Sequence, residues 1–139
     1  MKRRLLCLVL PIITLILEIL PYGAVCNFMR PPANEGDPVG HFRELYSYFD
    51  LTPFGYANFA PFLTALVTCI VLILLLVYFF TDKPRVISVT KVFLCIATVL
   101  SLCPLLYGIN FFSVVGALIT ASLIAELVLL SVAGKLKGK

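Results

Sequence analysis

The pattern of apolar and polar positions divides the chain into four long hydrophobic stretches and one long hydrophilic segment. Residues 59–80, FAPFLTALVTCIVLILLLVYFF, contain no formally charged side chain. A helix of about 22 residues is about 33 Å long, which spans the roughly 30 Å hydrocarbon core of a bilayer. Residues 5–22, 86–107 and 111–134 are similarly apolar. The pattern therefore predicts four transmembrane helices in a single domain, residues 1–139.

The polar connections between the last three stretches are short. Residues 81–85, TDKPR, combine charges with a proline that cannot continue a helix, and residues 108–110, GIN, form a tight turn. Connections of this length place consecutive helices antiparallel. We therefore expect an all-α fold, an integral membrane up-down four-helix bundle.

The hydrophilic segment, residues 23–58, has two halves of different composition. The first half is rich in Pro, Gly, Asn and Asp, which predicts irregular turns. In the second half, four apolar side chains follow the i, i+3, i+4, i+7 spacing of a short interfacial helix. Aromatic rings at this density are typical of anchors at lipid headgroups, and a binding lid is the alternative. The expected interfacial aromatic anchor consists of Phe42, Tyr46, Phe49, Phe54 and Tyr56.

Lysine and arginine residues are distributed unevenly across the expected membrane. Only Arg30 and Arg43 lie on the side of the hydrophilic segment. Nine lie on the side of the termini: Lys2, Arg3, Arg4, Lys83, Arg85, Lys91, Lys135, Lys137 and Lys139. The positive-inside rule then predicts a multi-pass protein of the cell membrane, with both termini in the cytoplasm and one long aromatic-rich outer loop.

A basic start followed by an apolar run is also typical of a cleaved signal peptide. The first apolar run is about 18 residues, longer than the usual signal core, and Glu18 interrupts it. We expect a retained first helix, with cleavage as the alternative.

Composition agrees with lipid as the solvent and argues against several functional classes. Hydrophobic residues make up 61% of the chain, against roughly half in soluble domains. The net charge of +4 comes from basic clusters beside the apolar stretches, so no nucleic-acid partner is expected. His41 is the only histidine and no Gly-rich phosphate loop occurs, so we expect no catalytic residues, no metal and no cofactor. The five cysteines lack metal or redox spacing, and a disulfide between Cys26 and Cys103 is the alternative to free thiols.

Three ionisable residues lie at membrane depth: Glu18, Lys91 and Glu126. Each costs about 2.5–3.5 kcal/mol on insertion into a bilayer, so each must face protein or water. One interpretation is a proton or ion relay formed by all three. The other interpretation is structural: Glu18 and Lys91 snorkel to the interfaces, and Glu126 is protonated or paired and fixes the helix register.

Small and polar side chains indicate where helices touch in lipid. In the first three stretches they form stripes at Cys7, Pro11, Thr14, Glu18 and Tyr22; at Pro61, Thr64 and Thr68; and at Ser88, Lys91, Cys95 and Thr98. The fourth stretch has a helix-packing face of small residues, Ser113, Gly116, Ala117 and Thr120. Ser122 and Glu126 lie about 130° from the centre of that face at 100° per residue, so the fourth helix is expected to contact neighbours on two sides.

A four-helix protein with a carboxylate in its first helix resembles the small multidrug resistance transporters, and Glu18 in the run LILEIL carries the resemblance. That resemblance would imply drug export by a dimer, but those proteins have short loops throughout, whereas residues 23–58 form a long segment. One large outer loop followed by a short one is similar to claudin-type tetraspan proteins, whose loop motif contains a Trp and paired cysteines. This chain has no Trp. Neither family is assigned from the sequence.

The function expected first is that of a non-enzymatic accessory or assembly subunit. It would contact the lipid bilayer, and its outer loop or the small-residue face of its fourth helix would meet a partner, either another membrane protein or a second copy of itself. The alternative is a small proton- or ion-coupled transporter that uses the intramembrane carboxylates. A dry, packed environment of Glu126 favours the first function, and a water-accessible cavity favours the second.

Overall fold

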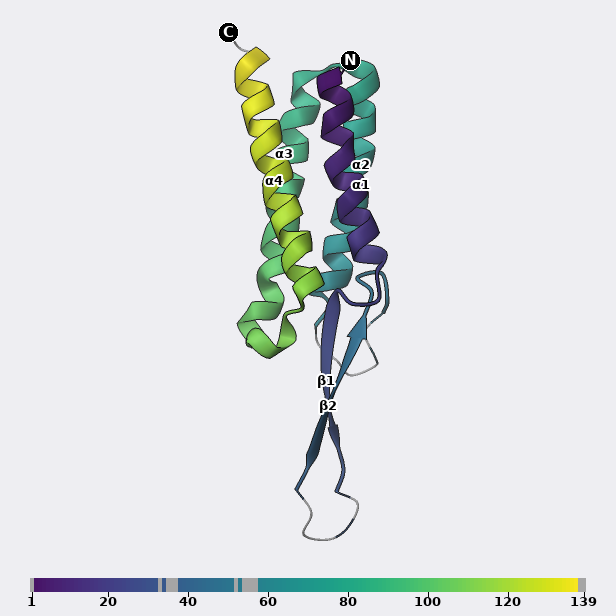
Figure 1. Ribbon diagram of the computed structural model, residues 1–139. Coiled ribbons are helices and arrows are strands. Elements are labelled where there is room, and N and C mark those ends of the chain that lie inside the picture. The colour runs from purple at the N-terminus through teal and green to yellow at the C-terminus, as the bar shows by residue number, and fades with distance from the viewer. Residues whose placement is uncertain (1, 33, 35–37, 52, 54–57, 138–139) are drawn as a thin grey trace.

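Within residues 2–32, 34, 38–51, 53 and 58–137, which the structure describes, this computed structural model contains four α-helices and one β-hairpin (Figure 1). In chain order the elements are α1 (Lys2–Ile19), β1 (Ala24–Arg30), β2 (Gly40–Tyr46), α2 (Ala60–Thr81), α3 (Pro84–Leu102), the 3-10 helices η1 (Cys103–Tyr107) and η2 (Ile109–Phe111), and α4 (Val114–Lys137). The mostly helical architecture that the hydrophobic pattern predicts is confirmed. The expectation of an all-α chain is wrong, because the hairpin is a two-stranded sheet.

Each helix packs against two others. α1 contacts α2 and α4, and α3 also contacts α2 and α4. Consecutive helices run in opposite directions, so the start of α1, the α2–α3 connection and the end of α4 lie together, and the hairpin lies beyond the opposite end (Figure 1). Three segments are long and apolar enough to cross a membrane: Ala60–Thr81, Pro84–Tyr107 and Val114–Val132. The described apolar part of α1, Cys7–Ile19, is shorter.

The polarity of these helices is inverted relative to a water-soluble protein. In the most apolar window of each membrane-length segment, only 28–33% of residues are buried. Large apolar side chains such as Ile73, Val92 and Val128 therefore remain more than half exposed on the outer surface. Thr64 and Thr90 by contrast are completely buried. An apolar exterior of this extent is typical of a surface that faces lipid.

Four residues with special backbone properties set the helix ends between α2 and α4: Asp82, Pro84, Pro104 and Gly108. Asp82, with a φ of +52°, closes α2 in a left-handed turn, and Pro84 begins α3, where its missing N–H costs no hydrogen bond. α3 gives way to the 3-10 helix η1 beside Pro104, which cannot donate to the preceding turn. Gly108 then adopts a φ of +120°, a conformation that favours glycine, and separates η1 from η2.

The hairpin contradicts the interfacial helix predicted in the second half of residues 23–58 and part of the irregular structure predicted in the first half. β1 and β2 pair in antiparallel register along their whole length, with Ala24 opposite Tyr46 at the base. The rings of Phe28 and Phe42 stack across the strands with centroids 5.3 Å apart. A helix of about eight residues is marginal in water, whereas pairing gives hydrogen-bond partners to the backbones of both segments. Strand pairing therefore replaces the short interfacial helix and the irregular structure expected at residues 24–30. The described turn residues between the strands lie outside regular structure, as predicted: Pro31, Pro32, Asn34, Pro38 and Val39.

The expected aromatic anchor residues accordingly do not share one helical face. Phe42 and Tyr46 lie in β2, and Phe49 packs against the core just after it. Phe54 and Tyr56 lie outside the described residues.

The base of the hairpin is attached to the chain between η2 and α4. Ala24 forms an antiparallel bridge with Phe112. The Arg43 guanidinium donates to the Phe112 carbonyl at 3.4 Å, and the Asn27 amide donates to the Asn110 carbonyl at 3.4 Å. The rest of the hairpin projects away from the helices (Figure 1).

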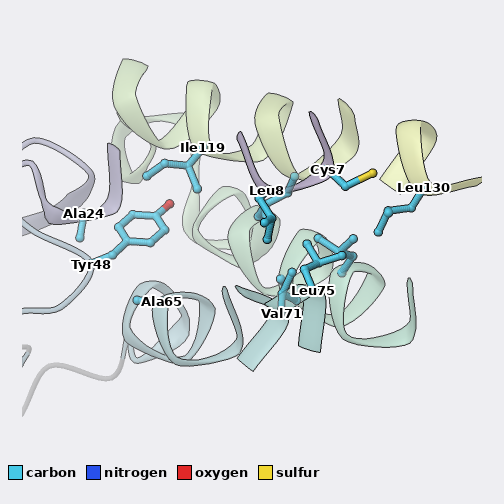
Figure 2. Packing of buried hydrophobic residues seen from close by; sticks show 12 residues of the cluster. Cys7, Leu8, Ala24, Tyr48, Ala65, Val71, Leu75, Ile119 and Leu130 are labelled. Atoms are coloured by element: carbon cyan, nitrogen blue, oxygen red, sulfur yellow. The ribbon is translucent and has the colours of Figure 1, made fainter. Parts of the chain in front are cut away.

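Buried apolar side chains run through the interior from the hairpin base towards the ends of the chain. Figure 2 shows the Tyr48 ring beside Ala24 and Ile119 at one end of this cluster, and Cys7 and Leu130 at the other. Tyr48 is only 1% exposed, although it follows a strand whose side chains are largely exposed. The segment after β2 therefore closes the hairpin end of the helices.

All five cysteines are free, so the alternative of a Cys26–Cys103 disulfide is not present. Cys26 lies in β1 and is 1% exposed. Burial, together with the neighbouring Glu44 carboxylate, raises the pKa of the Cys26 thiol to about 11. A thiol in this state contains little of the reactive thiolate at neutral pH.

We predict slow modification of Cys26 by a water-soluble maleimide. With the other four cysteines replaced by alanine, the labelling rate of Cys26 should be at least about tenfold below that of an exposed strand cysteine. The rate should rise with pH, because the thiolate fraction increases up to the pKa of about 11.

The matched control is Met29→Cys combined with Cys26→Ala, because Met29 belongs to the same strand and is 74% exposed. Equal labelling rates for the two positions would contradict the burial of Cys26.

Candidate functional site

The candidate site is a line of polar side chains between α1, α2 and α4. Its members, called the buried polar line below, are Thr14, Glu18, Thr68, Ser122 and Glu126. Ser122 is partly buried, and the other four are completely buried. Polar groups in an apolar interior need hydrogen-bond partners, so this line identifies where the helices depend on specific contacts.

Glu18, in the last turn of α1, accepts hydrogen bonds with both its side chain and its backbone. Its Oε1 accepts a hydrogen bond from the Thr68 hydroxyl of α2 at 2.8 Å. Its carbonyl oxygen, at a helix end where no intrahelical donor remains, accepts the Tyr48 N–H and the Ser47 hydroxyl, both at 2.9 Å. Glu18 therefore connects α1 to α2 and to the segment that follows the hairpin.

The hydroxyls of Thr14 and Ser122 connect α1 to α4 at 2.8 Å. Thr14 lies four residues before Glu18, and Ser122 lies four residues before Glu126. Because α1 and α4 are antiparallel (Figure 1), the two carboxyl groups lie one helical turn to either side of this hydroxyl pair.

Glu126 is completely buried in α4, and neither carboxyl oxygen has a hydrogen-bond partner among the described residues. Among the described side chains, the carboxyl group of Glu18 is close enough to interact with it electrostatically, and its charge would have the same sign. Cys7 of α1 also lies within its electrostatic range. A buried carboxyl without donors is rare in folded proteins and marks a candidate functional residue.

Lys91 differs from the two carboxyl groups in its burial. It is partly exposed on α3 and belongs to the predicted stripe of Ser88, Lys91, Cys95 and Thr98, of which no member is buried. The prediction that this stripe faces neighbouring helices is therefore wrong. The buried positions of α3 are Ile87, Thr90, Leu94, Ala97 and Ser101.

A physical reason for this error is visible at Thr98. Its hydroxyl donates to the Leu94 carbonyl of the same helix at 2.8 Å. A hydroxyl that is satisfied within its own helix needs no neighbouring helix and can face lipid.

The stripes predicted for the first two helices are confirmed. Pro61, Thr64 and Thr68 are all buried in α2. In the first stretch every predicted residue except Tyr22 is buried: Cys7, Pro11, Thr14 and Glu18. Tyr22 lies beyond the end of α1 and is 55% exposed.

The small-residue face of α4 packs within the chain. The Ser113 hydroxyl donates to the Gly23 carbonyl at 2.6 Å, and the Thr120 hydroxyl donates to the Ser101 hydroxyl of α3 at 3.0 Å. Gly116 is buried beside Ser113, whereas Ala117 is exposed. The fourth helix thus meets α3 and the α1–β1 connection on this face.

A groove lies between the hairpin and the chain before α4. Cross-strand neighbours Asn27 with Arg43 and Met29 with His41 provide one wall. Phe42 also contributes, and Asn110 and Phe111 form the other wall of this open depression of about 600 Å³. His41, which sequence analysis assigns no role, therefore lines a surface groove. The described residues contain no group of three His, Cys, Asp or Glu side chains that could hold a metal ion.

The sequence pattern does not identify Ser47 or Tyr48 as members of the candidate site. Thr68 was detectable as part of the polar stripe of the second helix. Ser47 and Tyr48 lie in an aromatic-rich segment whose composition gives no signal that these two residues, rather than their neighbours, are buried.

No protein-family model matches this chain, and no curated protein or solved structure is significantly similar to it.

We predict that Gly23→Ala destabilises the contact between α1, α4 and Tyr48. A Cβ at Gly23 would lie 2.8 Å from Cδ1 of Tyr48, a ring that is completely buried and cannot move aside. Overpacking of this kind costs about 1–3 kcal/mol. Thermal unfolding in detergent micelles, followed by circular dichroism, measures the loss.

Gly40→Ala in β2 is the control. The Cβ of an alanine at this position would lie 3.6 Å from the Cβ of Arg30, which is an ordinary van der Waals distance. The packing of Tyr48 would be contradicted if both variants unfolded at the same temperature as the wild type.

Proposed function

We propose that this chain is a small multi-pass membrane protein that acts as a non-enzymatic accessory or assembly subunit, and that its hairpin binds another membrane protein. The observation that supports this proposal is the position of the hairpin. It stands outside the helices with one face and one strand edge uncovered by any described part of the chain.

The membrane location is supported by the three apolar segments of membrane length and by their exposed apolar side chains. The first helix would be a fourth span, completed by residues that precede and follow its described apolar part. The four antiparallel helices would then cross the lipid as an up-down bundle.

The orientation follows from the charges. By sequence, nine Lys and Arg residues belong to the chain ends, the α2–α3 connection and the first half of α3, and two belong to the hairpin strands. The positive-inside rule places the termini in the cytoplasm and the hairpin on the outer face of the cell membrane.

The hairpin has the features of a strand that accepts a partner. A two-stranded hairpin is marginally stable alone, and β2 has β1 as its only strand neighbour in the described residues. Met29, Val39, Phe42 and Leu45 are between 41% and 74% exposed. An extended segment of a partner protein can pair with the free edge of β2 and place apolar side chains against these residues.

The orientation predicts side-specific labelling of single-cysteine variants in intact cells. Met29→Cys in the hairpin should react with a membrane-impermeant maleimide added outside. Lys83→Cys, at an exposed position between α2 and α3, should react only after the cells are permeabilised. Labelling of Lys83→Cys in intact cells would contradict the orientation.

The docking role predicts a specific crosslink from β2. A photoreactive residue at Leu45 should give one product of defined mass that contains a second, different membrane protein, identified by mass spectrometry in native membranes. Phe42→Asp should reduce its yield at least about fivefold, because the loss of a side chain that anchors an interface costs about 2 kcal/mol or more.

The matched control is the same photoreactive residue at Ile73, which is 59% exposed on the lipid-facing surface of α2. A product common to both positions, a product that contains only this chain, or no product from Leu45 would each contradict a docking role of the hairpin for a different protein.

A further inference from the structure

The hydroxyl of Thr68 has two acceptors but only one proton, so its contact with Glu18 can take up one more proton. The Thr68 hydroxyl lies 2.8 Å from Glu18 Oε1 and 3.0 Å from the Thr64 carbonyl oxygen, and both contacts have hydrogen-bond geometry. A hydroxyl has a single proton and can donate to only one of them. If Glu18 is protonated, its carboxyl group donates to Thr68 and Thr68 donates to Thr64, so both contacts are satisfied.

The hydroxyl pair of Thr14 and Ser122 has two equivalent directions. Thr14 Oγ1 lies 3.0 Å from the Leu10 carbonyl, Ser122 Oγ lies 2.8 Å from the Ile119 carbonyl, and the two hydroxyls are 2.8 Å apart. Two protons serve three contacts. Either Thr14 donates to Ser122, which donates to Ile119, or Ser122 donates to Thr14, which donates to Leu10. A change from one direction to the other is equivalent to the passage of a proton along the pair.

Glu126 lacks any donor that would stabilise a negative charge. Both oxygens are without hydrogen-bond partners in the described part of the chain, and the side chain is completely buried. An ionised carboxylate in such surroundings costs several kcal/mol. A bound proton removes that cost.

The described titratable side chains around the two carboxyls provide no compensating positive charge. Cys7 of α1 lies within electrostatic range of Glu126, and Cys69 of α2 and Tyr48 lie within electrostatic range of Glu18. Lys91 of α3 is partly exposed. Tyr78 is the remaining buried titratable side chain of α2. The interactions that remain are the mutual repulsion of two acidic groups and neutral side chains.

We propose that Glu18 and Glu126 are two proton-binding sites inside the helices and that the Thr14–Ser122 hydroxyl pair passes a proton between them. The proton leaves the Glu126 carboxyl for Ser122, Ser122 gives its own proton to Thr14, and Thr14 gives its proton to the Glu18 carboxylate. Both hydroxyls are neutral before and after the transfer, and one proton has moved from α4 to α1. Each carboxyl lies about 6 Å along the helix from its hydroxyl, a gap that a glutamate rotamer change or one water molecule bridges.

The proton occupancy is tested by infrared spectroscopy of the purified full chain in lipid bilayers. Protonated carboxyl groups give a C=O band separate from that of carboxylates. We expect Glu18→Gln and Glu126→Gln each to remove part of this band at neutral pH. The other acidic residues lie outside the apolar stretches, so any band that remains in one variant belongs to the other glutamate. The assignment therefore survives if only one variant folds.

The transfer step is tested by exchange into D2O, which shifts the C=O band of a carboxyl group when its proton is replaced by deuterium. The double substitution Thr14→Val with Ser122→Ala keeps approximate side-chain volume and removes the hydroxyl pair. We expect it to slow exchange at Glu126 at least about tenfold and to leave exchange at Glu18 unchanged.

The matched control is Thr120→Val with Ser101→Ala, which removes the other interhelical hydroxyl pair, 3.0 Å apart and also in α4. We expect this control to leave exchange at both glutamates unchanged.

The proposal is overturned if neither glutamine variant reduces the carboxyl band, if the Thr14 and Ser122 substitutions do not slow exchange at Glu126, or if the control slows it equally. None of these readouts depends on a partner, so they are independent of the docking role of the hairpin.

Discussion

The hydrogen bonds of Glu18 join three parts of the chain at one point: α1, α2 and the segment that follows the hairpin. Its side chain accepts a hydrogen bond from Thr68 in α2, and its carbonyl accepts two from Ser47 and Tyr48 after the hairpin. Apolar contacts in a lipid-like environment are weakly directional, because lipid tails compete for them equally well. Hydrogen bonds between buried groups therefore define the relative positions of α1, α2 and the outer segment.

Hydrogen bonds between buried groups also define the position of α4. One side contributes Ser113 and Thr120 to contacts with the α1–β1 connection and α3, and another side contributes Ser122 to the contact with α1. A hydroxyl group thus lies at the contact of α4 with each of these neighbours. The apolar side chains of Ile124 and Val128 remain exposed on the outer surface. Glu126 differs from these hydroxyls, because both of its carboxyl oxygens are buried without a donor among the described residues.

The sequence predicts the helices well because a long uncharged stretch has few alternative structures in lipid. It also predicts the inward stripes of the first two helices, where Glu18 and Thr68 are the most polar groups available. The sequence does not predict which face of a helix is buried where a polar side chain is hydrogen-bonded within its own helix, as Thr98 is within α3. It also does not predict strands that form only when two segments pair with each other. The hairpin belongs to the second case, because neither β1 nor β2 has a strong strand pattern alone. Of the candidate site, both carboxyls are identifiable from the sequence, whereas the Thr14–Ser122 contact requires knowledge of which helices are adjacent.

The position of Ser47 and Tyr48 directly after β2 has a mechanical consequence. Two residues couple the second strand to the carbonyl of Glu18, and the Tyr48 ring is wedged against Gly23 and Ile119. A sideways force on the hairpin is therefore transmitted directly to the final turn of α1. The hairpin would rotate about the buried ring of Tyr48.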